Sequence, residues 1–419
     1  MQQPTCIIIG AGASALMAAR QIAPHFKVII LEALPHIGGR IQTVVQEGDI
    51  IEAGPAFVHG NLPITLSLLG EAGINYVAAT GNMYRKKESK FAPVSEMTEG
   101  WDALLDKMSK ITDDITMQQL LKKYYSAPRY ESLRRHVASY TEGFDLADME
   151  KVSVKALYQE WSSADENIFR LPGGYAQLVE YLRQQLLLVN VNIVTGAIVS
   201  QVNWKRGSVT VQTLNGDRFE ADKLLVTVPV SVLQQAAGKA SIQFHPAIHF
   251  NSADANQVGF GAVIKVVVKF TEIFWQQDAG FIMSDELFPT WWTDLPAKRP
   301  ILTGWLGGPA AGKLSFHPDE ALLEKALHSL AAVYELTPAQ IKERVTWGRV
   351  FNWQKNEFAH GGYSYAMVGS KAARQLISTP LEDTLFFAGE GLYSGPYPGT
   401  VEAALASGIS AAEKIIACI

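Results

Sequence analysis

The stretch TCIIIGAGASALMAARQIAPHFKVIILEA, residues 5–33, constrains the fold more than any other part of the chain. It predicts an apolar strand at 5–9, an alanine-rich helix at 13–22 and a second apolar strand at 27–31. Strand, short turn, helix and strand in this order form a β-α-β unit, which is typical of parallel sheets covered by helices. We therefore expect an α/β protein with a Rossmann-like domain that includes this segment.

The turn between the first strand and the helix carries a G-x-G-x-x-A pattern made of Gly10, Gly12 and Ala15. In such a pattern the first glycine makes the tight turn, the second lets the backbone approach a pyrophosphate, and the third small residue allows close helix–strand packing. Glu32 ends the second strand 22 residues after Gly10, where a carboxylate accepts hydrogen bonds from ribose hydroxyls. These features in this order predict a dinucleotide site.

Composition excludes several other classes of protein. The 419 residues are 48% hydrophobic and 18% charged, which indicates a globular chain of two or three domains. A net charge of −5 argues against a general nucleic-acid binder. Two cysteines, Cys6 and Cys418, are too few for a disulfide framework or a cysteine-based metal site, so we expect no metal. With no basic segment before the first strand and no long apolar run, we expect a cytoplasmic protein without a membrane partner.

Three further segments indicate which dinucleotide is expected. PHIGGRIQTVV (35–45) and IIEAGPAFVHG (50–60) follow the first unit, and LFFAGEGLYSGPYPGTVEAALASGISAA spans 385–412. Together they resemble the flavin-containing amine oxidase family, which includes monoamine oxidases, polyamine oxidases and lysine-specific histone demethylases. The resemblance implies FAD as the cofactor. The positions that it assigns to FAD are Gly10, Gly12, Ala13, Ser14, Ala15, Glu32, Ala33, Gly39, Arg40, Gly54, Pro55, Ala56, Val199, Trp353, Gly389, Glu390, Thr400 and Val401.

The resemblance covers essentially the whole chain and implies a discontinuous FAD-binding domain. We expect this domain to comprise residues 1–75, 170–240 and 370–419. Residues 76–169 and 241–369 would form a mixed α+β substrate-binding domain. We expect a stand-alone form of the bacterial kind, without an added reader domain or a long inserted helical arm.

Local patterns add specific predictions within these domains. Asn215-Gly216 lies between two alternating segments and predicts a β-hairpin turn. GWDALLDKMSKITDD and YYSAPRYESLRRHVASY are expected to be helical. The basic run Arg85-Lys86-Lys87 is interpreted as a solvated loop.

The segment GAVIKVVVKF (261–270) places a lysine inside an apolar, β-branched strand. Burial of an unpaired ammonium is costly, so Lys265 could lie near a strand edge or extend its charged end to water. The resemblance gives another interpretation, because the family's G-x-x-x-K pattern with a following aromatic pair matches Gly261, Lys265 and Phe274-Trp275. In that family the lysine faces the flavin and holds a water at N5, so we expect Lys265 to be catalytic.

A second segment, NWQKNEFAHGGYSYAMVG (352–369), resembles the part of the family that supplies an aromatic cage. Tyr363 corresponds to an aromatic residue that stands beside the flavin, although it could also be a core aromatic after a Gly-Gly turn. Thr400 occupies the position of the opposite aromatic wall in monoamine oxidases. Gly362 replaces the cysteine that carries covalent flavin in those enzymes, so FAD should be bound non-covalently.

Residues near His59 are expected on the substrate side. His59 matches a substrate-side histidine of polyamine oxidases, although it could also be a loop histidine with its hydrogen bonds satisfied locally. Phe57 and Tyr397 are expected nearby. L-amino-acid oxidases have an arginine for the substrate carboxylate in the block 55–57, where this chain has Pro-Ala-Phe. The tryptophans Trp291, Trp292 and Trp305 could line the pocket or belong to the core.

We therefore expect an FAD-dependent amine oxidase acting on CH–NH groups, with a mono-, di- or polyamine and molecular oxygen as substrates and hydrogen peroxide as a product. A flavin desaturase or porphyrinogen-type oxidase on the same scaffold is an alternative, as is an L-amino-acid oxidase. A third is a flavoprotein that binds FAD only as structure. The sequence leaves the oligomeric state open.

Overall fold

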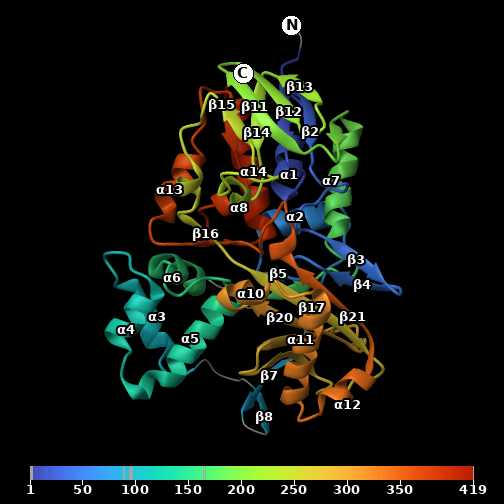
Figure 1. Cartoon of the computed structure of the whole chain (residues 1–419), viewed down its shortest axis with the longest axis vertical. Coiled ribbons are helices and arrows are strands. Elements are labelled where there is room, and N and C mark those ends of the chain that lie inside the picture. Colours follow the sequence, from blue (N-terminus) through green and yellow to red (C-terminus); the bar gives the residue numbers. More distant parts are fainter. Residues whose placement is uncertain (1–2, 88–89, 94–97, 164, 166, 419) are drawn as a thin grey trace.

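The computed structural model describes residues 3–87, 90–93, 98–163, 165 and 167–418. The chain forms two halves, one built on a parallel sheet and the other on a mostly antiparallel sheet (Figure 1). Both ends of the chain lie at the outer end of the first half (Figure 1). None of the described helices combines the length and the hydrophobicity that crossing a membrane requires.

The first half is organised around five parallel strands. In spatial order they are β10 (Asn192–Val194), β2 (Lys27–Leu31), β1 (Thr5–Ile9), β14 (Lys223–Val226) and β23 (Leu385–Phe387). The helix between β1 and β2 is α1 (Ala13–Ile22). The three elements have the bounds expected from the sequence, and β1 pairs with β2 in parallel, so the β-α-β prediction is confirmed.

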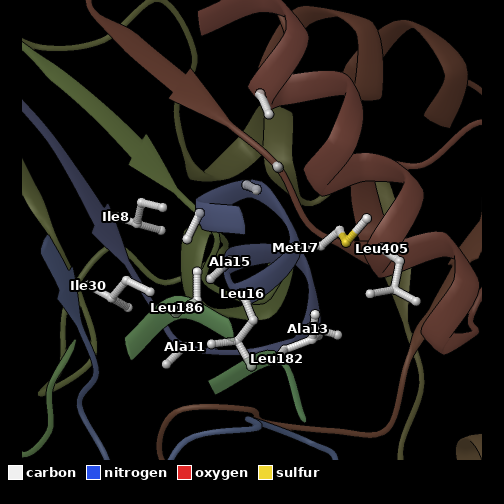
Figure 2. Packing of buried hydrophobic residues seen from close by; sticks show 14 of the residues in the cluster. Ile8, Ala11, Ala13, Ala15, Leu16, Met17, Ile30, Leu182, Leu186 and Leu405 are labelled. Atoms are coloured by element: carbon white, nitrogen blue, oxygen red, sulfur yellow. The ribbon is translucent and has the colours of Figure 1, made fainter. Parts of the chain in front are cut away.

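α1 is enclosed on all sides, and eight of its ten residues are buried. Figure 2 shows side chains of α7 (Ala176–Leu188), such as Leu182, and of α14 (Val401–Ile416), such as Leu405, packed around it. α14 approaches so closely that a Cβ added to Gly408 would lie 2.3 Å from the carbonyl oxygen of Ser14. Small residues on both helices permit this contact.

A second sheet adjoins the parallel sheet. Its strands, in spatial order, are β13 (Arg218–Ala221), β12 (Ser208–Thr213), β11 (Val199–Lys205) and β15 (Gln243–His245). β12 and β13 are antiparallel and flank Asn215-Gly216, so the hairpin prediction is confirmed. The other helices of this half are α2 (Pro63–Glu71), α8 (Val230–Leu233), α9 (Ser252–Ala255) and α13 (Ser370–Ile377).

The second half is built on a seven-stranded sheet. In spatial order its strands are β21 (Val345–Asn352), β17 (Val263–Phe270), β20 (Ile301–Gly307), β19 (Thr290–Thr293), β18 (Ala279–Met283), β7 (Asn82–Lys87) and β8 (Lys90–Pro93). The helices α10 (Gly308–Leu314), α11 (Asp319–Val333) and α12 (Pro338–Glu343) accompany the sheet, and a separate helical group contains α3 (Trp101–Ser109), α4 (Met117–Tyr124), α5 (Glu131–Gly143) and α6 (Val154–Ser162) (Figure 1).

Three small strand groups lie in the remaining segments. They are the hairpin of β3 (Thr43–Gln46) and β4 (Asp49–Glu52), the group of β5 (Val58–His59), β9 (Ile168–Arg170) and β6 (Val77–Ala78), and the pair of β16 (Val258–Phe260) and β22 (Ser364–Ala366). These groups bring distant parts of the sequence together, because β5 pairs with β9 and β16 with β22.

The interpretation of Arg85-Lys86-Lys87 as a solvated loop is wrong. These residues belong to β7, which pairs in parallel with β18 through Tyr84 and Arg85. β7 and β8 form one end of the sheet, where backbone pairing rather than apolar burial defines a strand. The polar composition of β7 therefore gave no indication of a strand.

All five parallel strands fall within the three segments expected for FAD binding, and the seven-stranded sheet is built from the other two. We propose this division as the domain organisation of the chain. β15, at residues 243–245, pairs with β11 although it follows the boundary expected at 240, so we extend the FAD-binding segment through this strand.

Candidate active site

A cavity of about 620 Å³ lies between the two halves and is lined by residues of both. Of the residues expected at the site, Ala15 alone does not line the cavity; it belongs to α1, is fully buried and packs in the core. Its part in the fingerprint is helix packing, and we propose that role for Ala15 in place of direct contact with the cofactor. The expected residues that do line the cavity are Gly10, Gly12, Ala13, Ser14, Glu32, Ala33, Gly39, Arg40, Gly54, Pro55, Ala56, Phe57, His59, Val199, Lys265, Trp353, Tyr363, Gly389, Glu390, Tyr397, Thr400 and Val401.

The glycine turn after β1 borders the cavity at the N-terminus of α1. Gly10 has φ +97°, a conformation that glycine adopts without strain. A Cβ at Gly12 would meet no atom within 4 Å, so its absence leaves open space toward the cavity. Gly38 donates its N–H to the carbonyl oxygen of Ala11 at 2.8 Å, which joins the second glycine turn to the first. The two turns form a backbone cradle with the shape that a pyrophosphate requires.

Glu32 lies at the end of β2, as expected, with 6% of its surface exposed. Its carboxylate accepts hydrogen bonds from the N–H groups of Ala11 at 2.6 Å and Leu34 at 2.8 Å. Burial raises the pKa of Glu32, and these hydrogen bonds oppose that shift. A carboxylate so placed can also accept hydroxyl groups of a ribose, since each oxygen retains a further lone pair.

Arg40 connects three segments of the sequence at the middle of the cavity. Its guanidinium donates to Glu390 Oε1 and to the carbonyl oxygen of Gly362, both at 2.7 Å. Glu390 is buried and also accepts the hydroxyl of Ser364 at 2.7 Å. This ion pair fixes the GGR turn, the FAGE segment and the segment before Tyr363 relative to one another.

The N-terminus of α14 also faces the cavity. Thr400 caps this helix by accepting the N–H of Ala403 at 3.1 Å, and its hydroxyl donates to the carbonyl oxygen of Tyr397 at 2.7 Å. The positive ends of two helix dipoles, those of α1 and α14, therefore point into one cavity. Glycine turns, a ribose-type carboxylate and two helix N-termini are the groups that FAD needs, so the residues present fit this cofactor.

Lys265 extends from β17 to the wall of the cavity and has 1% of its surface exposed. Its Nζ donates to the carbonyl oxygen of Glu52 at 3.0 Å and to that of Gly54. It lies 5.7 Å and 5.8 Å from the ring centroids of Trp292 and Trp305. Burial lowers the pKa of Lys265 to about 8, and the nearby carboxylate of Glu52 opposes that shift. Lys265 therefore does not extend to solvent, and its strand is paired on both sides, with β21 and β20, rather than lying at an edge of the sheet.

Aromatic rings form the walls around Lys265. Trp292 and Trp305 lie 5.8 Å apart, and Phe57 packs 5.6 Å from Trp292. Trp291 points to the opposite face of β19, where it is fully buried and its indole N–H donates to Phe288. Of the three tryptophans left open by the sequence, two line the cavity and one belongs to the core.

Tyr363 lines the cavity close to the N-terminus of α14. Its ring packs against the segment before α14, since a Cβ at Gly399 would lie 2.9 Å from Tyr363 Cδ2. Its hydroxyl donates to the carbonyl oxygen of Phe144. Burial raises the pKa of Tyr363 well above its ordinary value, so the phenol stays neutral. Thr400 lines the same cavity, and the wall is aromatic at Tyr363 and polar at Thr400.

His59 contributes a neutral ring to the cavity wall. Burial lowers its pKa to about 4. Its ring packs 5.6 Å from that of Phe57 and 5.5 Å from that of Phe144. An imidazole in this state can donate or accept a hydrogen bond but carries no charge at neutral pH.

Several cavity residues escaped the sequence analysis because they come from segments without a motif. Phe144 directly follows α5, Glu160 belongs to α6, and Arg85 comes from β7. Glu160 faces the buried Asp145, and burial raises the pKa of both carboxyl groups, that of Glu160 to about 7. Glu160 and Asp145 are separated by fifteen residues with no recognisable spacing, and only the tertiary fold brings them together.

Comparisons with known proteins agree with this geometry. A family model described as flavin containing amine oxidoreductase matches residues 14–416. Polyamine oxidase 2 of Arabidopsis thaliana is 26% identical over 98% of this chain and 88% of its own length. Lysine-specific histone demethylase 1B of Mus musculus is 28% identical over 98% of this chain, which spans 52% of that protein.

Solved structures share the fold. A putrescine oxidase bound to putrescine superposes with a TM-score of 0.83 at 20% identity, with 99% of both chains covered. A cyclohexylamine oxidase from Brevibacterium oxydans gives a TM-score of 0.82 at 18% identity and the same coverage.

The two halves and the cavity between them define a flavin-dependent oxidoreductase. Since the family model spans nearly the whole sequence, the chain belongs to the flavin-containing amine oxidoreductases, and it is an amine-oxidising enzyme with FAD as its cofactor. The expected family, the α/β fold with a Rossmann-like FAD-binding part, and the FAD cofactor are confirmed. Cys6 and Cys418 both lie in the described part of the chain, and neither lines the cavity, so no cysteinyl link to the flavin is available.

Proposed function

We propose that this protein oxidises a mono-, di- or polyamine by hydride transfer from the amine-bearing carbon, and that oxygen then accepts the electrons to give hydrogen peroxide. The observation that carries the proposal is a buried lysine in an aromatic cavity that is continuous with the FAD-type cradle. FAD supplies the hydride acceptor when it is bound. The remaining steps concern residues of the chain itself.

The cofactor would be held by the residues that border the cradle. The pyrophosphate would lie against the glycine turns and the N-terminus of α1, and the ribose against Glu32. The N-terminus of α14 would stabilise negative charge on the ring system, and the Arg40–Glu390 pair would keep these segments in place.

The aromatic walls would prepare the amine for oxidation. Hydride can leave the carbon only when the nitrogen has a free electron pair, so the amine must be neutral. Removal of water by Phe57, Trp292 and Trp305 disfavours an ammonium ion and so favours the neutral amine. The neutral rings of Tyr363 and His59 would orient the amine without adding charge. Loss of hydride leaves a protonated imine, which water then hydrolyses to a carbonyl compound and an amine or ammonia.

Lys265 would act in the second half of the reaction. Its ammonium, present below a pH of about 8, points into the cavity and would stabilise the negative charge that develops on oxygen as electrons reach it. Two protons then complete hydrogen peroxide.

The cavity favours amines without an adjacent carboxylate. Residues 55–57 carry no cation, and the guanidinium of Arg170 lies 4.5 Å from the centroid of the Phe57 ring. Arg170 does not line the cavity, and its guanidinium donates to the carbonyl oxygen of Thr293 at 2.6 Å. A substrate carboxylate would meet aromatic side chains in this region, which argues against an L-amino-acid oxidase.

The test is anaerobic mixing of the FAD-loaded protein with n-butylamine, benzylamine, 1,4-diaminobutane and L-leucine while flavin absorbance is followed. We expect at least one of the three amines to bleach the flavin, and air to restore the absorbance with formation of one hydrogen peroxide per flavin. Dithionite, which reduces any accessible flavin, serves as the positive control. Bleaching by dithionite but by no amine in a wider amine series would refute the proposal and favour a desaturase or a structural flavin.

A further inference from the structure

The hairpin strand β4 places two carboxylates opposite two lysines of β17. Lys269 and Lys265 lie on the same face of β17, four residues apart. Lys269 Nζ forms an ion pair with Asp49 Oδ2 at 2.7 Å, and Asp49 also accepts from Arg299 at 3.1 Å. The contact between Lys265 and Glu52 is not an ion pair of this kind.

Lys265 contacts the backbone of Glu52 rather than its carboxylate. Its ammonium donates to the carbonyl oxygens of Glu52 and Gly54, as described above. The Glu52 carboxylate is held from its other side, because Oε1 accepts the hydroxyl of Thr43 at 2.8 Å and the N–H of Tyr175 at 2.7 Å. Oε2 is buried without a hydrogen-bond partner among the described residues.

The charged groups that act on Lys265 come from two elements. Glu52 of β4 favours the ammonium, and Arg170 of β9 disfavours it. Arg170 is itself 4.0 Å from Asp294. The neighbouring strands β20 and β21 present Trp305 and Phe351 opposite Lys265, and neither of them is charged. Glu52 is thus the carboxylate that compensates the buried ammonium within the described residues.

We propose that Glu52 is a positioning residue for this oxidation. Its carboxylate, fixed by Thr43 and Tyr175, keeps Lys265 protonated inside the cavity, and its carbonyl oxygen sets the place of the ammonium. The catalytic consequence rests on the proposed function, whereas the electrostatic coupling between the two side chains does not. Coupling between two titrating groups is reciprocal, so Lys265 must hold the Glu52 carboxylate ionised to the same extent.

The coupling can be measured directly by NMR. Lysine labelled with ¹³C at Cε reports the titration of Lys265 in the FAD-loaded protein, and Lys265→Met assigns the signal. An interaction between two unit charges that are close but not in direct contact, at an effective dielectric of about 20 to 40, corresponds to a shift of about 1 to 2 pH units. We expect Glu52→Gln, which retains an oxygen acceptor for Thr43 and Tyr175, to lower the Lys265 midpoint by that amount.

Glu402→Gln is the matched control. Glu402 is also a buried carboxylate that accepts backbone N–H groups, those of Ile64 at 2.9 Å and Thr65 at 2.7 Å. Its substitution should leave the Lys265 midpoint in place. A Lys265 midpoint that is unchanged by Glu52→Gln, or that moves equally in both variants, would overturn the proposal.

The reciprocal measurement covers the case in which Glu52→Gln does not fold. Glutamate labelled at Cδ then reports Glu52 in the wild type and in Lys265→Met, and the Glu52 midpoint should rise by about 1 to 2 pH units when the lysine is removed. An unchanged Glu52 midpoint would refute the coupling.

The kinetic consequence is a shift in a pH profile. The rate at which oxygen restores the flavin should begin to fall at a lower pH in Glu52→Gln, by the same 1 to 2 units, while the wild-type profile is recovered by Glu52→Asp. Failure of every amine to reduce the flavin would refute the proposed function but would leave the electrostatic coupling measured by NMR valid. If amines reduce the flavin but the titration midpoint of Lys265 is unchanged in Glu52→Gln, only the proposed role of Glu52 would be refuted.

Discussion

Replacement of Lys265 by methionine should change the pH dependence of stability more than stability at neutral pH. Methionine keeps most of the volume and apolar character of the lysine stem, and such exchanges in a packed strand generally cost less than about 1.5 kcal/mol. The carbonyl oxygens of Glu52 and Gly54 lose their donor, which costs about 1–3 kcal/mol each. The substitution also removes the buried ammonium, and this removal stabilises the folded state.

The size of that relief follows from the pKa of Lys265. Burial moves this pKa from 10.5 to about 8, and each unit corresponds to about 1.4 kcal/mol, so the ammonium destabilises the fold by about 3 kcal/mol below pH 8. Near pH 7 the lost hydrogen bonds and the relief are of similar size, and the two proteins should have comparable unfolding free energies.

The sign of the pH effect is fixed by the depressed pKa. Between pH 8 and 10.5 the unfolded wild type binds more protons than the folded protein, so its unfolding free energy rises with pH. Lys265→Met lacks this gain, and the wild type should therefore become more stable than the variant by about a further 3 kcal/mol across this range. The removal of Lys265 also raises the pKa of Glu52, and ionisation of that carboxylate acts in the same direction.

Urea unfolding followed by tryptophan fluorescence at pH 7.5, 9 and 10.5 gives the comparison. Lys122→Met, at an exposed position of α4, controls for the change in net charge. A difference between wild type and Lys265→Met that stays constant from pH 7.5 to 10.5 would refute the reasoning, because a lysine that snorkels to water has no burial penalty to lose.

Two further predictions concern the cofactor and the substrate. Glu32→Ala should raise the dissociation constant of FAD by about 10-fold to 100-fold, since a ribose loses a charge-assisted acceptor worth about 1.5–3 kcal/mol; titration of apoprotein with FAD measures this, and an unchanged constant would contradict the Rossmann-type assignment. His59→Ala should lower kcat/KM for 1,4-diaminobutane more than for n-butylamine, because a neutral imidazole can accept a hydrogen bond from a second amino group; equal losses in a peroxide-coupled assay would make His59 a structural residue.

The sequence predicted those parts of the fold and site in which the role of a residue is set by its neighbours in the sequence. Gly10 and Gly12 are required by a turn that any strand–helix crossover of this kind contains, so their place could be inferred without the rest of the chain. The β-branched run around Lys265 likewise identified a strand. The position of Lys265 in the cavity could be predicted only from the family resemblance, because a pattern of apolar residues does not indicate what a single polar residue among them faces.

The missed residues depend on contacts between distant segments. β7 has a basic, solvent-like composition, yet it pairs with β18 nearly 200 residues away and brings Arg85 to the cavity. The facing of Glu52 and Lys265 depends on the packing of the β3–β4 hairpin against β17. Sequence periodicity describes one element at a time, and it contains no information on which distant elements pack against each other.

The order of strands in the parallel sheet has a consequence for how the protein is made. β1 and β2 are synthesised before β14, which follows about 190 residues later, and β23 and α14 come later still. The apolar face of α1 that α14 covers in the finished molecule therefore stays uncovered until α14 has been synthesised. Contacts over such sequence separations form slowly and leave apolar surface exposed to aggregation in the meantime. Chaperone capture of nascent chains should consequently persist until residues 401–416 have left the ribosomal tunnel.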